Sequence, residues 1–382
     1  MTLNAAPPLG VYIHWPYCAR ICPYCDFNVV RARGRTDEET ALVRAITADL
    51  TAQAAMIGPR TLVSIFFGGG TPSLMAPEAV ASLIATARRL WPTDGPVEIA
   101  LEANPTDAEA GRFAGFRDAG VERLSLGVQA FDNEHLCFLG RAHDGTETLR
   151  AAETAAATFP RLSLDLIYAL PGQTEAAWTQ TLRRAAGLGA EHISPYQLTI
   201  ESGTPFDRAV RRGRFAPADE ELGARLYETT QAALEDLGFD AYEVSNHARG
   251  EAAQARHNLV YWRGEDYVGV GPGAHGRLTC PDGTRLASEA EARIPAYMDR
   301  VGATGTGATF TEQSALDQAE ERLLMGLRTG EGLALDEVSA LPLKSLDDLI
   351  ESGHLVRNGN RFAATAAGRL VLDNVTRRLI LS

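Results

Sequence analysis

The length, composition and charge of the chain exclude several classes of protein. Its 382 residues suffice for two or three domains, and with 45% hydrophobic and 22% charged residues the composition is that of an ordinary globular protein. The net charge of -13 argues against a nucleic-acid partner, because phosphate contacts need a basic surface, and no eighteen-residue apolar stretch is present that could span a membrane.

The first two-thirds of the chain alternate short apolar or β-branched runs with longer amphipathic segments. The short runs predict strands at 11–15, 62–67, 97–103, 123–129, 161–168 and 192–198. Helices are predicted between them, near 37–56, 76–91, 106–119, 144–157 and 174–188. Repeated strand–helix units predict parallel strands with helices outside them. Because six units are too few for a closed eight-stranded barrel, we expect an α/β fold with a partial, open (β/α)6 barrel like a TIM barrel.

The pattern changes after residue 200. A long helix is predicted near 217–237, followed by a region rich in glycine and aromatic residues, 241–278. From about residue 310 the chain predicts helices around a hairpin whose turn is Asn358-Gly359-Asn360, which is typical of a small winged-helix-like domain. We therefore expect a core barrel (1–205), an extension (206–305) and a C-terminal domain (306–382). Winged domains often bind DNA, but the acidic charge favours a packing or partner surface.

Three clustered cysteines, Cys18, Cys22 and Cys25, have the spacing C-x3-C-x2-C. This spacing supplies three thiolates to a [4Fe-4S] cluster and leaves one iron open to bind and reduce a ligand. A structural zinc site would need a fourth cysteine or histidine close by, and none follows in residues 26–29. The remaining Cys137 and Cys280 are expected to be buried apolar fillers. An oxygen-sensitive cluster, together with a start at Met1 that lacks a signal-peptide pattern, predicts a cytoplasmic location.

Glycine and polar residues stand at or just past the C-terminal ends of successive predicted strands, where barrel folds build active sites. A glycine run before Thr71 lets the backbone approach a ligand. Glu102 suits a grip on ribose hydroxyls, and Arg141 suits a carboxylate. Asp165 lies in an apolar strand and needs a polar ligand or an arginine nearby. For each of these residues an ordinary loop or salt-bridge role stays open. The candidates at this edge are Gly69, Gly70, Thr71, Glu102, Gln129, Arg141 and Asp165.

Two further candidates lie outside that edge. Period-two alternation puts Tyr12 on the same strand face as His14, so that Tyr12 points into the barrel beside the cysteines, although a core tyrosine is an equal alternative. His257, followed by amide, aliphatic and aromatic side chains, has the pattern of an axial haem ligand with an apolar wall. A lone histidine near aromatic residues is more often structural.

Taken together, these segments resemble the radical S-adenosylmethionine (SAM) superfamily, and within it the branch of oxygen-independent coproporphyrinogen III oxidase and the haem chaperone HemW. The resemblance implies that Cys18, Cys22 and Cys25 hold the cluster, whose open iron takes SAM. It also implies SAM contacts from Tyr12, Gly69, Gly70, Thr71, Glu102, Gln129, Arg141 and Asp165. The matching segments are YIHWPYCARICPYCDF, FFGGGTPS, LEANP, RLSLGVQAF, LGRAH, DLIYALPGQT, HISPYQLTIESGTPF, YEVSNHA, HNLVYW and GVGPGAHG.

Three differences between the two relatives favour the chaperone. The oxidase has a long extension before its cysteines, whereas here they begin at residue 18, and it has a further cysteine where this chain has Phe27. HNLVYW resembles the HNxxYW haem motif of the chaperones, which implies that His257 ligates haem.

The chaperone resemblance implies partners and leaves catalysis open. It implies delivery of haem to respiratory haem proteins at the membrane, with transient membrane association, an electron donor such as flavodoxin or ferredoxin, and a homodimer. SAM cleavage without oxidase activity stays open. The alternative is the oxidase itself, which decarboxylates coproporphyrinogen III propionates in porphyrin biosynthesis.

Overall fold

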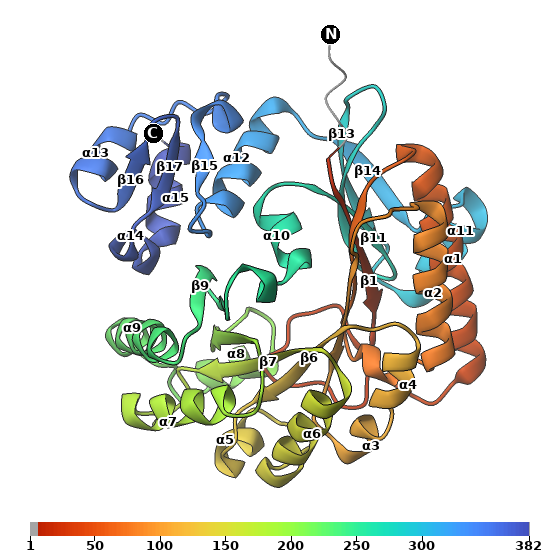
Figure 1. Ribbon diagram of the computed structural model, residues 1–382, viewed down its shortest axis with the longest axis horizontal. Coiled ribbons are helices and arrows are strands. Elements are labelled where there is room, and N and C mark those ends of the chain that lie inside the picture. The colour runs from red at the N-terminus through yellow and green to blue at the C-terminus, as the bar shows by residue number, and fades with distance from the viewer. Residues whose placement is uncertain (1–6, 382) are drawn as a thin grey trace.

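A computed structural model describes residues 7–381, without the side chains of Asp107 and Ala108. The prediction that the start of the chain lacks a signal-peptide pattern therefore falls mainly outside the described residues. Within residues 7–381, twelve strands form one sheet in the order β14-β13-β12-β11-β1-β4-β5-β6-β7-β8-β10-β9. Within the span from β11 to β8, each strand runs parallel to the next one in this order. The sheet curves into an open barrel, with most of the first helices on its convex side (Figure 1).

The six predicted strands are confirmed in place and direction, as is the open (β/α) barrel. They are β1 (Leu9–Trp15), β4 (Leu62–Gly69), β5 (Glu98–Ala103), β6 (Arg123–Gln129), β7 (Arg161–Tyr168) and β8 (His192–Gln197). The predicted helix near 106–119 is split in two. The helices between the strands are α1 (Thr36–Ile57), α2 (Pro77–Leu90), α3 (Asp107–Ala110), α4 (Phe113–Asp118), α5 (Asn133–Phe138), α6 (Gly145–Thr158) and α7 (Glu175–Ala186).

The middle of the chain extends this sheet at both edges, which the sequence did not predict. At one edge β11 (Asp266–Val270) runs parallel to β1 and begins an antiparallel series, and at the other edge β10 pairs antiparallel with β8. The antiparallel series continues through β12 (His275–Thr279), β13 (Arg285–Ala290) and β14 (Ala308–Glu312). The other elements of this region are α8 (Pro205–Arg211), α9 (Glu220–Asp236), β9 (Asp240–Glu243), β10 (Asn246–Ala248), α10 (Arg256–Trp262) and α11 (Ile294–Thr304). The domain limits stay a prediction.

The segment before α10 is fixed to the N-terminal ends of the barrel strands by two arginines. Buried Arg123 donates to the carbonyl oxygens of Ala253 (2.5 Å) and Gln254 (3.2 Å). Two carboxylates balance the two arginines: Glu98 lies 3.2 Å from Arg123 and 2.6 Å from Arg161, and Glu191 also contacts both, which makes burial of these charges tolerable. As a result α10 lies on the concave side of the sheet, opposite the outer helices (Figure 1).

A C-terminal unit with its own apolar core follows. The core includes Leu323, Leu349, Phe362 and Leu379. The predicted hairpin is confirmed, with Gly359 at a φ of 60° in its turn. Its elements are α12 (Ala315–Gly326), β15 (Leu333–Ala334), α13 (Leu346–Glu351), β16 (Leu355–Asn358), β17 (Arg361–Ala364), α14 (Ala366–Leu370) and α15 (Leu372–Leu381).

Two expectations about single features have clear outcomes. The prediction that Cys137 and Cys280 are buried fillers is wrong, because Cys137 is exposed on the short helix α5 and Cys280 is half-buried at the end of β12. In the described part of the chain, we find no helix long and apolar enough to cross a membrane.

Candidate functional site

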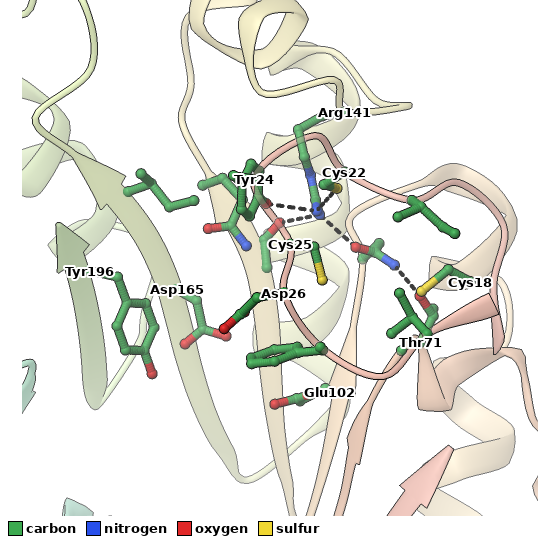
Figure 2. Close-up of a pocket in the computed structure, with 18 of the residues that line it drawn as sticks. Cys18, Cys22, Tyr24, Cys25, Asp26, Thr71, Glu102, Arg141, Asp165 and Tyr196 are labelled. Atoms are coloured by element: carbon green, nitrogen blue, oxygen red, sulfur yellow. Dashed lines mark hydrogen bonds between the residues drawn. The ribbon is translucent and has the colours of Figure 1, made fainter. Parts of the chain in front are cut away.

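The three clustered cysteines lie on one loop beside the C-terminal ends of the barrel strands. Cys18 ends the short strand β2 (Tyr17–Cys18), which pairs with β3 (Val30–Arg31) and so closes the loop. Inside it, the N–H of Cys25 donates to the carbonyl oxygen of Cys22 at 3.2 Å. All three cysteines line a pocket of about 400 Å³, here called the cysteine pocket (Figure 2).

The candidates predicted at the strand ends come together in this pocket. Besides the cysteines, the predicted residues that line it are Gly69, Gly70, Thr71, Glu102, Gln129, Arg141 and Asp165. They come from β4, β5, β6, β7 and the segment after α5, so the fold gathers residues that are far apart in the sequence. Their assigned contacts with SAM stay a prediction.

Arg141 connects the cysteine loop to the strands. Its guanidinium donates to the Cys22 Sγ (3.3 Å), to the Asn104 Oδ1 (2.5 Å) and to the carbonyl oxygen of Gly127 (2.9 Å). Figure 2 shows Arg141 reaching toward Cys22 and Tyr24. A cation that donates to sulfur stabilises the thiolate, the form that binds metal. The Nε of Arg141 is buried without a partner among the described residues.

The glycine run after β4 packs against the cysteine loop itself. Gly70 donates its N–H to the carbonyl oxygen of Trp15 (2.7 Å), and a Cβ at Gly70 would lie 2.7 Å from the carbonyl oxygen of Tyr17. Only glycine permits this approach. The next residue, Thr71, hydrogen-bonds the Cys18 thiol. The run therefore fixes the position of Cys18.

Glu102 and Asp165 are two half-buried carboxyls that line the cysteine pocket (Figure 2). Burial, and then the charge of Asp165, raises the pKa of Glu102 to about 8. Burial raises the pKa of Asp165 to about 6, although the Ser125 hydroxyl donates to both its oxygens (3.1 and 2.9 Å). Glu102 accepts the N–H of Gly69 at 3.2 Å. Both carboxyls are thus available to accept further hydrogen bonds from a polar ligand.

Gln129 has an unusual backbone conformation. Its φ is 63°, a left-handed value that is uncommon for a residue other than glycine, and it ends β6 at the pocket. Such conformations occur at functional sites, where the surrounding structure holds them in place. Here the turn directs the chain away from the sheet and leaves the Gln129 side chain on the pocket wall.

The cysteine pocket has a donor set that suits an iron–sulfur cluster, namely three cysteine sulfurs on one loop, one of which accepts from a guanidinium. Among the side chains that the structure describes, no group of three His, Cys, Asp or Glu residues is placed to hold one metal ion. One zinc ion would bring its sulfur ligands within about 4 Å of one another, since each Zn–S bond is about 2.3 Å long. Burial raises the pKa of Cys25 to about 11, so binding a cluster must release protons.

Tyr12 and His257 lie outside the cysteine pocket. Tyr12 donates to or accepts from the His14 Nδ1 at 2.9 Å, and its ring lies 6.0 Å from that of His257. Both line a smaller cavity of about 190 Å³ deeper in the barrel, here called the His257 cavity. This cavity shares Glu102 and Asp165 with the cysteine pocket. Their roles in binding SAM and haem stay predictions.

Several site residues were missed by the sequence-based analysis. Asn104 donates to the Thr71 hydroxyl (3.2 Å) and accepts from Arg141, so it links two candidates. Ser125 supplies the polar partner that Asp165 needed, in place of the expected arginine or ligand. Tyr24 shares the Arg141 guanidinium with Cys22. Ser125 itself lines the cysteine pocket, and its hydroxyl between Leu124 and Leu126 of β6 was the available signal.

Comparisons with known proteins agree with this geometry. The Radical SAM superfamily model matches residues 12–185, and the HemN C-terminal domain model matches residues 313–371. The mitochondrial radical S-adenosyl methionine domain-containing protein 1 of Bos taurus is 37% identical over 388 residues, covering 97% of this chain and 87% of that protein. Heme chaperone HemW of Escherichia coli (strain K12) is 37% identical over 380 residues, covering 97% of each.

A solved structure supports the fold. Coproporphyrinogen III oxidase (HemN) from Escherichia coli matches with a TM-score of 0.79 and 22% identity, over 98% of this chain and 90% of that one. The fold and the cysteine pocket thus define a radical SAM protein. Within that superfamily, the chain belongs to the family of the heme chaperone HemW and of radical S-adenosyl methionine domain-containing protein 1.

Proposed function

We propose that this protein is a haem chaperone that holds a [4Fe-4S] cluster and SAM, binds haem and delivers it to respiratory haem proteins at the membrane. The observation that carries the proposal is the near full-length similarity to proteins named heme chaperone HemW. Cys18, Cys22 and Cys25 would hold the cluster, which supplies an electron to SAM when bound. An electron donor such as flavodoxin or ferredoxin would reduce the cluster.

The residues around the cluster would bind and orient SAM. Glu102 would accept hydrogen bonds from ribose hydroxyls, while the Arg141 guanidinium holds Cys22 toward the pocket. Gly69, Gly70, Thr71, Gln129 and Asp165 would complete this wall, and Tyr12 would contribute from the deeper cavity. Each of these residues either lines the cysteine pocket or, for Tyr12, lines a cavity that shares Glu102 with it.

The proposal is tested by haem titration of the anaerobically reconstituted protein. A shifted Soret band with saturable binding supports a haem chaperone, and transfer of that haem to membrane vesicles containing apo-forms of respiratory haem proteins tests delivery. Assay of the same sample with coproporphyrinogen III and SAM tests the alternative. Sustained formation of protoporphyrinogen would overturn the chaperone proposal in favour of the oxidase.

A further inference from the structure

The structure encloses His257 on all sides. Its ring is stacked on Phe66 with centroids 4.5 Å apart and planes 6° from parallel. Its Nε2 lies 2.5 Å from the Tyr261 hydroxyl, and its Nδ1 lies 3.4 Å from the Ser64 hydroxyl. The residue is 2% exposed, and its cavity of about 190 Å³ is smaller than the roughly 300–1,000 Å³ of pockets for drug-sized ligands. A porphyrin therefore does not reach this imidazole unless the barrel interior opens.

Another pocket, of about 410 Å³, lies next to the HNLVYW segment that contains His257. We call it the aromatic pocket. Its walls include Phe27 of the cysteine loop, Tyr261 and Trp262 at the end of α10, Tyr267 of β11, and Met325 of α12. Phe27 is 62% exposed, and the buried indole N–H of Trp262 has no partner among the described residues. Flat aromatic walls, a thioether and an unused donor suit a planar macrocycle.

The residues that line the aromatic pocket include the imidazole of His275. It lines the aromatic pocket, its side chain is exposed, and neither ring nitrogen has a hydrogen-bond partner among residues 7–381. Its backbone is held firmly: a Cβ at Gly269 would lie 1.8 Å from the carbonyl oxygen of His275, so only glycine allows β12 to approach β11 so closely. An accessible, unpaired imidazole on a firmly held backbone, beside an aromatic wall, can ligate a haem iron without opening the barrel.

We propose that haem binds in the aromatic pocket with His275 as its axial ligand, and that Tyr261 and Trp262 of the HNLVYW segment form its wall. This inference rests on the proposed haem chaperone function. In this assignment the aromatic residues of the motif pack against the macrocycle. His257 holds Tyr261 in position from the barrel interior, through the hydrogen bond of 2.5 Å between its Nε2 and the Tyr261 hydroxyl.

The charges of the pocket set the orientation of the haem. Glu102, Glu265 and Glu321 line the aromatic pocket, and the nearby Arg277 is already paired with Glu321 at 2.7 Å. Among the described residues that line this pocket there is no arginine or lysine to pair with a propionate, so the propionate edge of haem faces the solvent. A coproporphyrinogen carries propionates on all sides, so it cannot bind in this pocket with every propionate in the solvent. This disfavours the oxidase alternative at this pocket.

The aromatic pocket also borders the cysteine pocket. Phe27, Gly69 and Glu102 line both. Haem bound at His275 therefore shares a wall with the proposed cluster and SAM site, and its binding should alter the absorption of the cluster.

The test compares three histidine variants of the full chain, anaerobically reconstituted and titrated with ferric haem. His275→Ala should weaken haem affinity at least tenfold and shift the Soret band, and added imidazole should restore the wild-type band. His257→Phe keeps an aromatic ring against Phe66 and should retain the wild-type Soret band. His354→Ala, in the C-terminal unit, is the matched control and should behave as the wild type.

The outcomes separate this inference from the proposed function. If wild-type protein shows no saturable haem binding, the chaperone function fails, and this inference fails with it. If wild-type protein binds haem and His275→Ala binds it with unchanged affinity and spectrum, only the His275 assignment is overturned. The same holds if His257→Phe alone loses the Soret shift while its cluster content and thermal melting match the wild type.

Discussion

The cysteine pocket and the His257 cavity contain the residue types expected of metal sites, but they present them in opposite ways. In the cysteine pocket, Arg141 and Thr71 hydrogen-bond sulfur atoms from behind and leave the thiols on the wall of a pocket of about 400 Å³. In the His257 cavity, both imidazole nitrogens are occupied by hydroxyls and the ring is covered by Phe66. Protein groups that are fully satisfied are typical of structural roles, whereas incompletely satisfied groups at a pocket indicate a ligand.

Protonation also distinguishes His257 from Glu102, a carboxyl that the cysteine pocket and the His257 cavity share. Burial lowers the pKa of His257 to about 3, so its ring is neutral at physiological pH and forms neutral hydrogen bonds with its neighbours. Burial raises the pKa of Glu102 to about 8, so this carboxyl changes charge near physiological pH. The comparison therefore predicts that mutations of the cysteines themselves mainly affect ligand binding.

The largest expected effect comes from the cysteines. Cys22→Ala removes one of the three thiolates and the acceptor of the Arg141 guanidinium, so we expect bound iron and the cluster absorption band to fall to background after anaerobic reconstitution. Cys137→Ala, at an exposed position on α5, is the matched control and should keep the full iron content. Iron retained at the wild-type level in Cys22→Ala would rule out the proposed ligand set.

Arg141→Ala should have the next largest effect. It leaves the Asn104 side chain and the Gly127 carbonyl without their donor, which should lower the free energy of unfolding of the cluster-free protein by about 2–3 kcal/mol. It should also weaken SAM binding, because Cys22 and the pocket wall lose their connection. Urea unfolding and SAM titration measure the two effects.

Two further variants of the same kind check this interpretation of Arg141. Arg141→Lys keeps a charge but lacks the forked geometry, so it should restore only part of the stability. Arg117→Ala, on the exposed side of α4, should change the free energy of unfolding by less than about 0.5 kcal/mol. If the two alanine variants are equally stable, the connecting role of Arg141 is wrong.

The sequence predicted the barrel well because its parallel strands are continuous apolar runs separated by long amphipathic helices. It missed the outer strands for a physical reason. β11 pairs with β1, whose register joins Leu9 to Asp266, and such distant pairings leave no trace in local periodicity. Short strands such as β9 and β10 also give too few residues for an alternating pattern.

The candidate site was predictable in its members but not in its contacts. Strand ends were enough to select Glu102 and Gln129, because all parallel strands end at one edge. Asp165 lies inside β7, and its charge among apolar residues was the signal that selected it. Residues that act through tertiary contacts, such as Asn104 beside Arg141, carry no signal of their own. His275 stood in the matching segment GVGPGAHG, yet only the structure shows that its imidazole is exposed and unpaired.

The smallest expected effect is a change in pH dependence at Glu102. Its pKa is about 8 in the folded protein and near 4.5 when unfolded, so the folded state binds more protons between these values. The contribution of Glu102 to stability is therefore greatest at low pH and is lost as the pH rises from about 4.5 to 8. In Glu102→Gln this loss is absent, so the variant should gain stability relative to wild type across that range and reach a constant difference above it.

Urea unfolding of the cluster-free protein at a series of pH values measures this difference directly. Glu78→Gln, at an exposed position on α2, is the control and should give a curve parallel to that of the wild type above pH 6. A Glu102→Gln curve that is likewise parallel would mean that the carboxyl is ionised when folded. In that case Glu102 would be charged in the folded protein at neutral pH. It would then not be the incompletely satisfied group on which the comparison with His257 depends.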